Sequence, residues 1–248
     1  MDRTRLIPAG AIRRAVARLG AWFDVATGAA LPFVLGTLLV GPGIALATSD
    51  AELATNARLL ASVRNDDVAG VTRALHEGAA VNSRNRLGET SLLLALKTSR
   101  ADIAHALLDA GADVNVAAIN GVTPLMAAAY AGQTDLAELL LARGANPSAT
   151  DQLGKNAITY AAGEGHTEVV RVLLRHGVDA NAVYRNKLTA LMWAAGYGKT
   201  DTVRALIEAG ARVDLVDDRG KSALDMARDF KHADTVQLLE QALRAQRP

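Results

Sequence analysis

The chain contains no cysteine among its 248 residues. This absence excludes disulfide bonds, a thiol nucleophile, a thiolate metal site and the cysteine that carries a bacterial lipid anchor. Aromatic residues are also scarce, at 4% of the chain, whereas hydrophobic residues make up 50%. We therefore expect an aliphatic core, and the chain has enough apolar residues for one elongated domain.

The sequence also lacks the residue patterns of common catalytic and cofactor sites. Its five histidines are dispersed, and no two stand at the i, i+4 spacing of a helical zinc site. A Gly-x-Ser-x-Gly motif is absent. The run Gly196-Tyr197-Gly198-Lys199-Thr200 looks like part of a phosphate loop, but Trp193 stands where that motif needs a glycine. We predict no enzyme activity, no metal and no cofactor.

What the sequence does contain is a repeat of 33 residues, which separates five successive glycines. They are Gly78, Gly111, Gly144, Gly177 and Gly210. A series of alanines from Ala95 to Ala227 and a series of leucines from Leu107 to Leu239 follow the same interval. A self-similar unit of this length predicts a stacked solenoid in which each repeat contacts its neighbours.

One copy of the unit is preserved best. It reads Asn120-Gly121-Val122-Thr123-Pro124-Leu125, continues with Ala128-Ala129, Gly132 and Leu139-Leu140-Leu141, and closes on Gly144-Ala145-Asn146. This copy closely resembles the ankyrin repeat, and the resemblance extends over roughly residues 50–245. It implies an all-α solenoid of helix pairs with short β-hairpin-like turns, in about six repeats including two caps. The expected repeats are 50–83, 84–116, 117–149, 150–182, 183–215 and 216–245.

Five polar residues are predicted to begin the inner helices, because their side chains can accept hydrogen bonds from free N–H groups at a helix start. They are Thr90, Thr123, Asn156, Thr189 and Ser222. Pro124 suits the first helical position, and the glycine after each outer helix can end it in the left-handed conformation. Lys187 and Ser99 depart from this pattern, since both stand where a turn glycine is expected. We interpret His166 and His232 as side chains that bridge the turns of neighbouring repeats.

The ends of the array also depart from the pattern. The stretch from Ala51 to Val81 forms a helix pair without a Thr-Pro-Leu start, and the last outer helix carries Gln237, Gln241 and Arg244. We interpret both ends as caps with a polar outer face. Between them, small alanine pairs on the inner helices and bulky leucine pairs on the outer helices predict a curved stack with a concave inner face.

Residues 1–47 have the layout of a secretory signal peptide. Five arginines precede an apolar stretch from Ala29 to Val40, a break at Gly41-Pro42-Gly43, and the small-residue sequence Ala45-Leu46-Ala47. We predict cleavage after Ala47 and a mature domain of residues 48–248, periplasmic in a Gram-negative host or secreted. The alternative is an uncleaved inner-membrane anchor, with the repeats again outside the cytoplasm.

Cleavage after Ala47 removes five of the 27 basic and two of the 26 acidic side chains, which leaves 22 and 24. A domain with a net charge of about −2 lacks the basic stripe that nucleic-acid binding requires. We therefore expect no nucleic-acid partner, and membrane association only if the N-terminal segment is retained.

The aromatic residues provide the main functional signal, because none of those after residue 47 falls on an expected outer helix. A helical projection at about 100° per residue places Trp193 and Tyr197 opposite the apolar side formed by Leu191, Ala194 and Ala195. Residues at matching positions of other repeats extend the predicted partner-binding surface. The full set is Tyr130, Leu153, Tyr160, Leu188, Trp193, Tyr197, Met226 and Phe230.

Large rings on a rigid concave surface are typical anchors of protein recognition sites. The competing interpretation is that these rings lock adjacent inner helices together. We predict a non-catalytic, monomeric scaffold that presents the rings and the hairpin tips to a protein partner. Alternative functions are a carrier of small molecules or peptides that uses the aromatic groove, and a membrane-tethered spacer.

Overall fold

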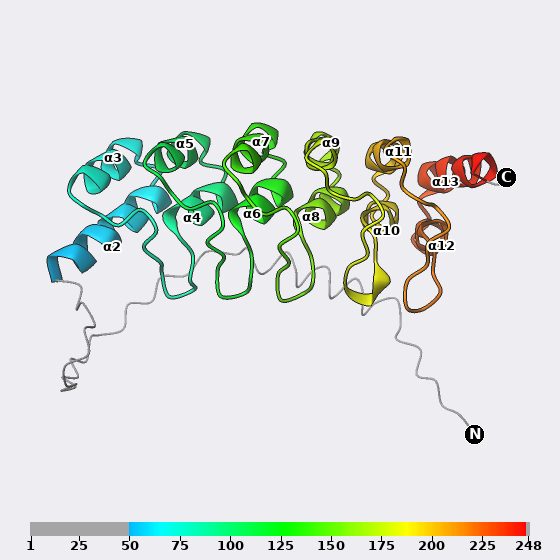
Figure 1. Ribbon diagram of the computed structural model, residues 1–248, viewed down its shortest axis with the longest axis horizontal. Coiled ribbons are helices and arrows are strands. Elements are labelled where there is room, and N and C mark those ends of the chain that lie inside the picture. The colour runs from blue at the N-terminus through cyan, green and yellow to red at the C-terminus, as the bar shows by residue number, and fades with distance from the viewer. Residues whose placement is uncertain (1–49, 247–248) are drawn as a thin grey trace, which may run out of the picture. The chain divides into compact units, whose positions relative to one another are not determined.

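The computed structural model describes residues 50–246, which contain twelve α-helices in six consecutive pairs (Figure 1). The first helix of each pair is an inner helix: α2 (Asp50–Arg64), α4 (Ser91–Lys97), α6 (Pro124–Tyr130), α8 (Ala157–Glu164), α10 (Ala190–Gly196) and α12 (Ala223–Asp229). The second is an outer helix: α3 (Val68–His76), α5 (Ala101–Asp109), α7 (Thr134–Ala142), α9 (Thr167–Arg175), α11 (Thr200–Glu208) and α13 (Ala233–Ala245). The predicted signal segment, residues 1–47, lies outside the described residues.

The helices of the array form two parallel rows. Each inner helix contacts the inner helix of the next repeat and the outer helix of its own pair. Figure 1 shows the connecting loops extending from the inner row, on the side away from the outer row. Within the described residues these loops form no named strands, and isolated β-bridges join Arg84 to Thr90 and Val216 to Ser222. The predicted all-α solenoid with hairpin-like turns is confirmed.

The predicted starts of the inner helices are confirmed residue by residue. Each of the five polar side chains accepts a hydrogen bond from the backbone N–H three residues later, at distances of 3.2 to 3.3 Å. The backbone N–H groups of Asn156 and Ser222 donate in return to the side chains of Thr159 and Asp225, which completes a capping box at both helices. Pro124 lies in the first turn of α6, where no backbone N–H is needed.

The turns between helices keep one geometry even where glycine is missing. The five glycines of the 33-residue series have φ angles between 83° and 90°, as the left-handed helix end requires. Ser99 and Lys187, which replace glycines at two other turn positions, both have a φ of 56°. Stacking therefore holds these two residues in a conformation that costs a non-glycine residue about 1–2 kcal/mol.

The core is aliphatic, as predicted, and it runs through both helix rows. Its largest fully buried side chains are leucine, isoleucine and methionine, for example Leu107, Leu140, Ile158 and Leu173. At the C-terminal end, α13 buries Leu239 while its polar residues Gln237, Gln241 and Arg244 are exposed. The prediction of a polar-faced C-terminal cap is thus confirmed.

Side chains before the outer helices connect neighbouring repeats. The Nε2 atom of His166 lies 2.9 Å from the carbonyl oxygen of Tyr130, and that of His232 lies 3.1 Å from the carbonyl oxygen of Gly196. A methyl group on Gly132 would lie 2.6 Å from the Nδ1 atom of His166, so this contact requires glycine. Both histidines bridge neighbouring repeats, as the sequence analysis predicted.

Candidate functional site

The inner helices α6, α8 and α10 leave one stripe of side chains uncovered. In α10, Leu191, Met192, Ala194 and Ala195 are buried, whereas Trp193 is partly exposed. In α8 the exposed or partly exposed positions are Tyr160 and Glu164, and in α6 the only one is Tyr130. We call the surface formed by these stripes the inner face, and its partly exposed large side chains are aromatic.

The aromatic side chains of the inner face contact one another, between repeats in one pair and within a repeat in the other. Tyr130 and Tyr160 meet edge to face, with ring centroids 6.0 Å apart and an interplanar angle of 84°. Trp193 and Tyr197 are stacked, also at 6.0 Å, with an angle of 14°. The Nζ atom of Lys155 lies 5.3 Å from the Tyr160 centroid and 4.1 Å from the Trp193 centroid, within the range of cation–π attraction. We call these five residues the ring row.

Three members of the ring row contact identifiable groups beneath them. The Tyr160 hydroxyl donates a hydrogen bond of 2.5 Å to Oδ2 of Asp151, which is buried in the preceding hairpin. The other oxygen of Asp151 accepts from the backbone N–H groups of Leu153 and Lys155. A methyl group built on Gly163 would lie 3.8 Å from the Tyr197 ring and 3.9 Å from the Trp193 ring. Both rings therefore lie over α8 at Gly163, at a distance that would be ordinary van der Waals contact for an added methyl group.

Burial changes the acid–base properties of the ring row. Burial and the hydrogen bond to Asp151 raise the pKa of the Tyr160 hydroxyl, so it remains a donor. Burial and the charge of Glu164 raise the pKa of Tyr130 and of Tyr197. Burial lowers the pKa of the Lys155 ammonium, against the opposing charges of Asp151 and Glu164. The result is one partly desolvated cation among neutral rings.

The remaining predicted site residues lie at the edges of the ring row. Phe230 is 44% exposed and stacks on His232, with centroids 6.4 Å apart. Met226 is 7% exposed and lies beside Gly196, so little of its side chain is available to a partner. Leu153 is 47% exposed at a hairpin tip, whereas Leu188 packs partly against the core.

The hairpin tips of the earlier repeats carry a further apolar edge. Leu87 is 64% exposed and Ile119 is 68% exposed. These two adjacent tips are hydrogen bonded to each other: the N–H of Ile119 donates to the carbonyl oxygen of Leu87 at 3.0 Å. These tips are therefore ordered relative to each other and continue toward Leu153.

Lys155 and Asp151 are members of the site that the sequence analysis did not identify. A lysine two residues after an exposed hairpin tip has no local signal for contact with a ring in the next repeat. Asp151 did have a sequence signal, because Asn85 and Asp217 stand at the matching positions of other hairpins. Each of these side chains also accepts two backbone N–H bonds within its own hairpin. Tyr184 has a supporting role, because its hydroxyl accepts a bond of 2.9 Å from the Asn156 amide.

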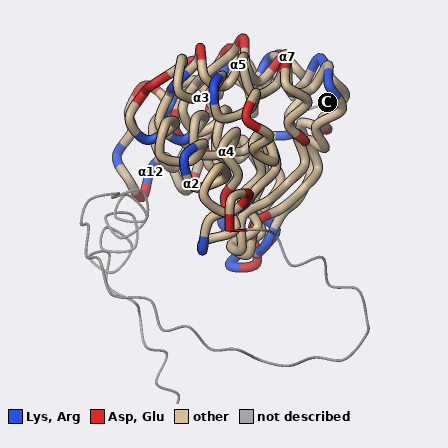
Figure 2. The backbone as a smooth tube through the Cα atoms, turned by 90° about the vertical axis from the view of Figure 1, so that its left-hand side faces the viewer, with Lys and Arg blue, Asp and Glu red and all other residues tan. Residues whose placement is uncertain are grey.

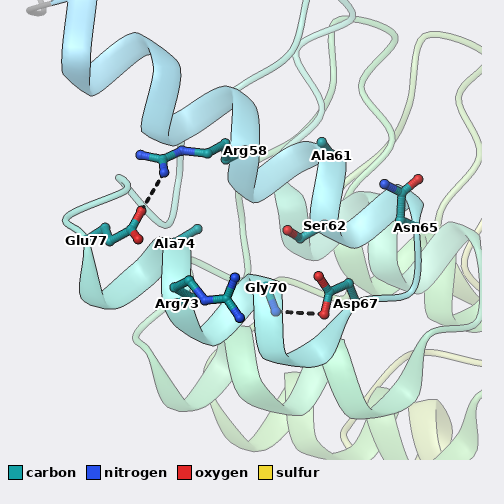
Figure 3. Close-up of a pocket in the computed structure, with 9 residues that line it drawn as sticks. All are labelled: Arg58, Ala61, Ser62, Asn65, Asp67, Gly70, Arg73, Ala74 and Glu77. Carbon is teal, nitrogen blue, oxygen red and sulfur yellow. Dashed lines mark hydrogen bonds and ion pairs between the residues drawn. The ribbon is translucent and has the colours of Figure 1, made fainter.

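A second concave feature lies in the N-terminal cap, between α2 and α3 (Figure 3). This cavity has a volume of about 190 Å³ and a lining of both polar and apolar groups. Arg58 forms an ion pair of 2.9 Å with Glu77, and Asp67 accepts from the backbone N–H of Gly70 at 2.8 Å. The ion pair joins α2 to the C-terminal end of α3, whereas the Asp67 bond caps the start of α3.

The described residues offer little for metal or phosphate chemistry. They contain no cluster of three or more histidine, aspartate and glutamate side chains placed to hold a metal ion. Lys199 lies between two helices, where its backbone N–H donates to Ala194 and its side chain covers Gly165, so the geometry is not that of a phosphate loop. In the view of Figure 2, basic and acidic residues are interspersed. Within residues 50–246 no helix combines the length and apolar character needed to cross a membrane.

Stacked helix pairs with a shared core and an exposed inner face define the chain as a solenoid repeat protein. The family model described as ankyrin repeats (three copies) matches residues 59–151, 110–184 and 158–245. These matches extend over well more than half of the sequence, so the chain belongs to the ankyrin-repeat family. Ankyrin repeats are in general protein–protein interaction modules, and members of the family are typically non-catalytic scaffolds. A comparison with curated proteins gives no significant match.

Proposed function

We propose that this protein is a non-catalytic scaffold that binds a protein partner through the ring row on its inner face, outside the cytoplasm. The ring row is rigid, because its rings rest on inner helices that are buried on their other sides. The partner therefore meets a preformed surface, which reduces the entropy lost on binding. The exposed tips Leu87, Ile119 and Leu153 add a peripheral contact area.

The observation that carries this proposal is the concentration of partly exposed aromatic rings. In the described residues every tyrosine and tryptophan belongs to an inner helix, its C-terminal cap or a hairpin. Four of them, together with Lys155, make up the ring row. Aromatic residues are enriched among the few interface residues that supply most of a binding energy. The same rings also contact one another between repeats, and part of their contribution is therefore to stability.

The proposed location rests on the sequence of residues 1–47, which lie outside the described residues. Arginines, an apolar stretch and Ala45-Leu46-Ala47 follow the order of an export signal. In a Gram-negative host, this signal would deliver the repeats to the periplasm.

Affinity capture from an envelope fraction tests the proposal. The full chain serves as bait beside two variants, Trp193→Ala in the ring row and Arg86→Ala at an exposed hairpin tip. We expect one protein to be captured by the wild type and by Arg86→Ala, and to be depleted with Trp193→Ala. Equal capture by all three baits would contradict the proposed surface, and capture only from a cytoplasmic fraction would contradict the proposed location.

A further inference from the structure

Lys155 has no carboxylate partner, although Lys221, at the equivalent position of the sixth repeat, has one. One position in each hairpin carries Glu89 in the second repeat, Lys155 in the fourth and Lys221 in the sixth. Glu89 pairs with Lys97 at 2.5 Å, and Lys221 pairs with Asp229 at 3.2 Å. In both repeats the partner stands eight residues later on the inner helix. The residue at that place after Lys155 is Gly163, which has no side chain to supply the opposite charge.

The absence of a carboxylate at Gly163 leaves the Lys155 ammonium with rings as its neighbours. Its Nζ atom forms no ion pair or hydrogen bond with any described residue, and its contacts are the ring faces of Trp193 and Tyr160. An ammonium group has three N–H donors, and a ring face satisfies them less well than an oxygen does. Lys155 is also partly buried, so water compensates for the missing oxygens only in part.

Two further donors stand beside Lys155 on the inner face. The indole N–H of Trp193 and the hydroxyl of Tyr197 form no hydrogen bond with the described residues. The inner face thus offers several donors around apolar ring surfaces. The same surface carries one exposed carboxylate, Glu164, which interacts electrostatically with both Lys155 and Tyr197.

We infer that the partner segment that docks on the ring row carries a carboxylate, which pairs with the Nζ atom of Lys155 and is flanked by apolar side chains that cover the rings. The inference rests on the proposed function and specifies the chemistry of the partner. The partner supplies the charge that Asp229 supplies to Lys221 within the sixth repeat. Because the ammonium is already partly desolvated, the pair gains more than an exposed ion pair would.

Selection from displayed peptides tests the inference with the full chain immobilised in mild detergent. Three libraries of equal length have the same random flanking positions, and their central residue is fixed as Glu, Gln or Lys. We expect the wild-type protein to enrich binders from the Glu library. Lys155→Met should weaken those binders roughly tenfold or more, which corresponds to the loss of a charge-assisted pair. Lys221→Met is the matched control, since that lysine already has Asp229, and it should leave binding unchanged.

Glu164→Gln distinguishes an acidic partner from a basic one. For an acidic peptide this variant removes a repulsive charge, so affinity should rise by a few fold. Enrichment of the Lys library, with binding weakened by Glu164→Gln and strengthened by Lys155→Met, would overturn the inference while the proposed surface stands. Binders from every library that are insensitive to Trp193→Ala would contradict the proposed surface itself, and the inference with it.

Discussion

At the scale of single residues, the side chains that precede α7, α9 and α13 fasten one repeat to the previous one. The side-chain caps of the inner helices act within a repeat, whereas His166 reaches the carbonyl of Tyr130 in the repeat before it. Gln133 has the same role one repeat earlier, where its amide donates to the carbonyl of Leu96 at 3.0 Å. These hydrogen bonds add to the apolar contacts between repeats and to polar contacts such as the hydrogen bond between the Thr167 and Thr202 hydroxyls.

Substitution of His166 tests this role. His166→Ala should lower the free energy of unfolding by about 1 kcal/mol, because a partly buried carbonyl loses its donor. His105→Ala is the control, since His105 is exposed on α5 and forms no hydrogen bond with the described residues. Denaturant unfolding of both variants measures the difference. Equal effects of the two substitutions would show that the inter-repeat bond contributes nothing.

Residue-level features differ in how well the sequence predicts them. The helix caps and turn glycines depend on a side chain and the backbone within a few residues, so a repeating pattern identifies them. The position of Lys155 was missed, because its contact depends on Trp193 of the next repeat and on the absence of a side chain at Gly163. Met226 was expected on the exposed inner surface by alignment with Trp193, yet its side chain is buried beside Gly196.

At the scale of elements, the hairpin tips share a positive-φ turn that is built from different residues. Four hairpin tips have glycine with a φ between 72° and 84°, at positions 88, 121, 154 and 220, whereas the tip in 183–189 has Lys187. There Asn186 also adopts a positive φ, of 61°, and the tip forms the 3-10 turn η2 (Arg185–Lys187). This element was not predicted, because the sequence rule expects glycine and does not specify how a lysine would replace it.

Reciprocal substitutions at two tips measure this backbone cost. Lys187→Gly should raise the free energy of unfolding by up to about 1 kcal/mol, because the left-handed strain outweighs the added freedom of the unfolded chain. The ion pair of Lys187 with Asp218, 3.6 Å and exposed, should contribute little.

The reverse change, Gly220→Lys, should lower the free energy of unfolding by about 1 kcal/mol, because Gly220 has a φ of 73°. An added Cβ would meet no atom within 4 Å, so this loss would come from the backbone conformation and not from a steric clash. Calorimetric melting of both variants tests the pair. A loss of stability in Lys187→Gly would indicate that the lysine side chain, and not the turn geometry, determines this tip.

At the scale of the whole molecule, the sequence predicted the architecture more completely than the binding surface. A repeat specifies which elements neighbour which, so the two helix rows follow from the 33-residue period. The proposed recognition surface depends on residues that break the period, such as Lys155 and Trp193, and their joint geometry emerges only when repeats are stacked.

The location of the protein is a separate prediction at this scale. The order of the arginines, the apolar stretch and Ala45-Leu46-Ala47 predicts a mature protein that begins at Thr48. N-terminal sequencing of protein from fractionated cells checks the cleavage site and the compartment together. Full-length chain in the cytoplasm would contradict export, and full-length chain in the membrane fraction would favour the tethered spacer.

The central claim is that the ring row supplies the binding energy for a protein partner. The most direct measurement is the affinity of the captured partner for Trp193→Ala and Tyr197→Ala, with melting temperatures recorded on the same samples. Each substitution should weaken binding by about 2 kcal/mol or more in a folded protein, whereas Arg86→Ala should cost under about 1 kcal/mol. Unchanged affinity in folded Trp193→Ala and Tyr197→Ala, with lowered melting temperatures alone, would show that the rings lock the helices together and would contradict the claim.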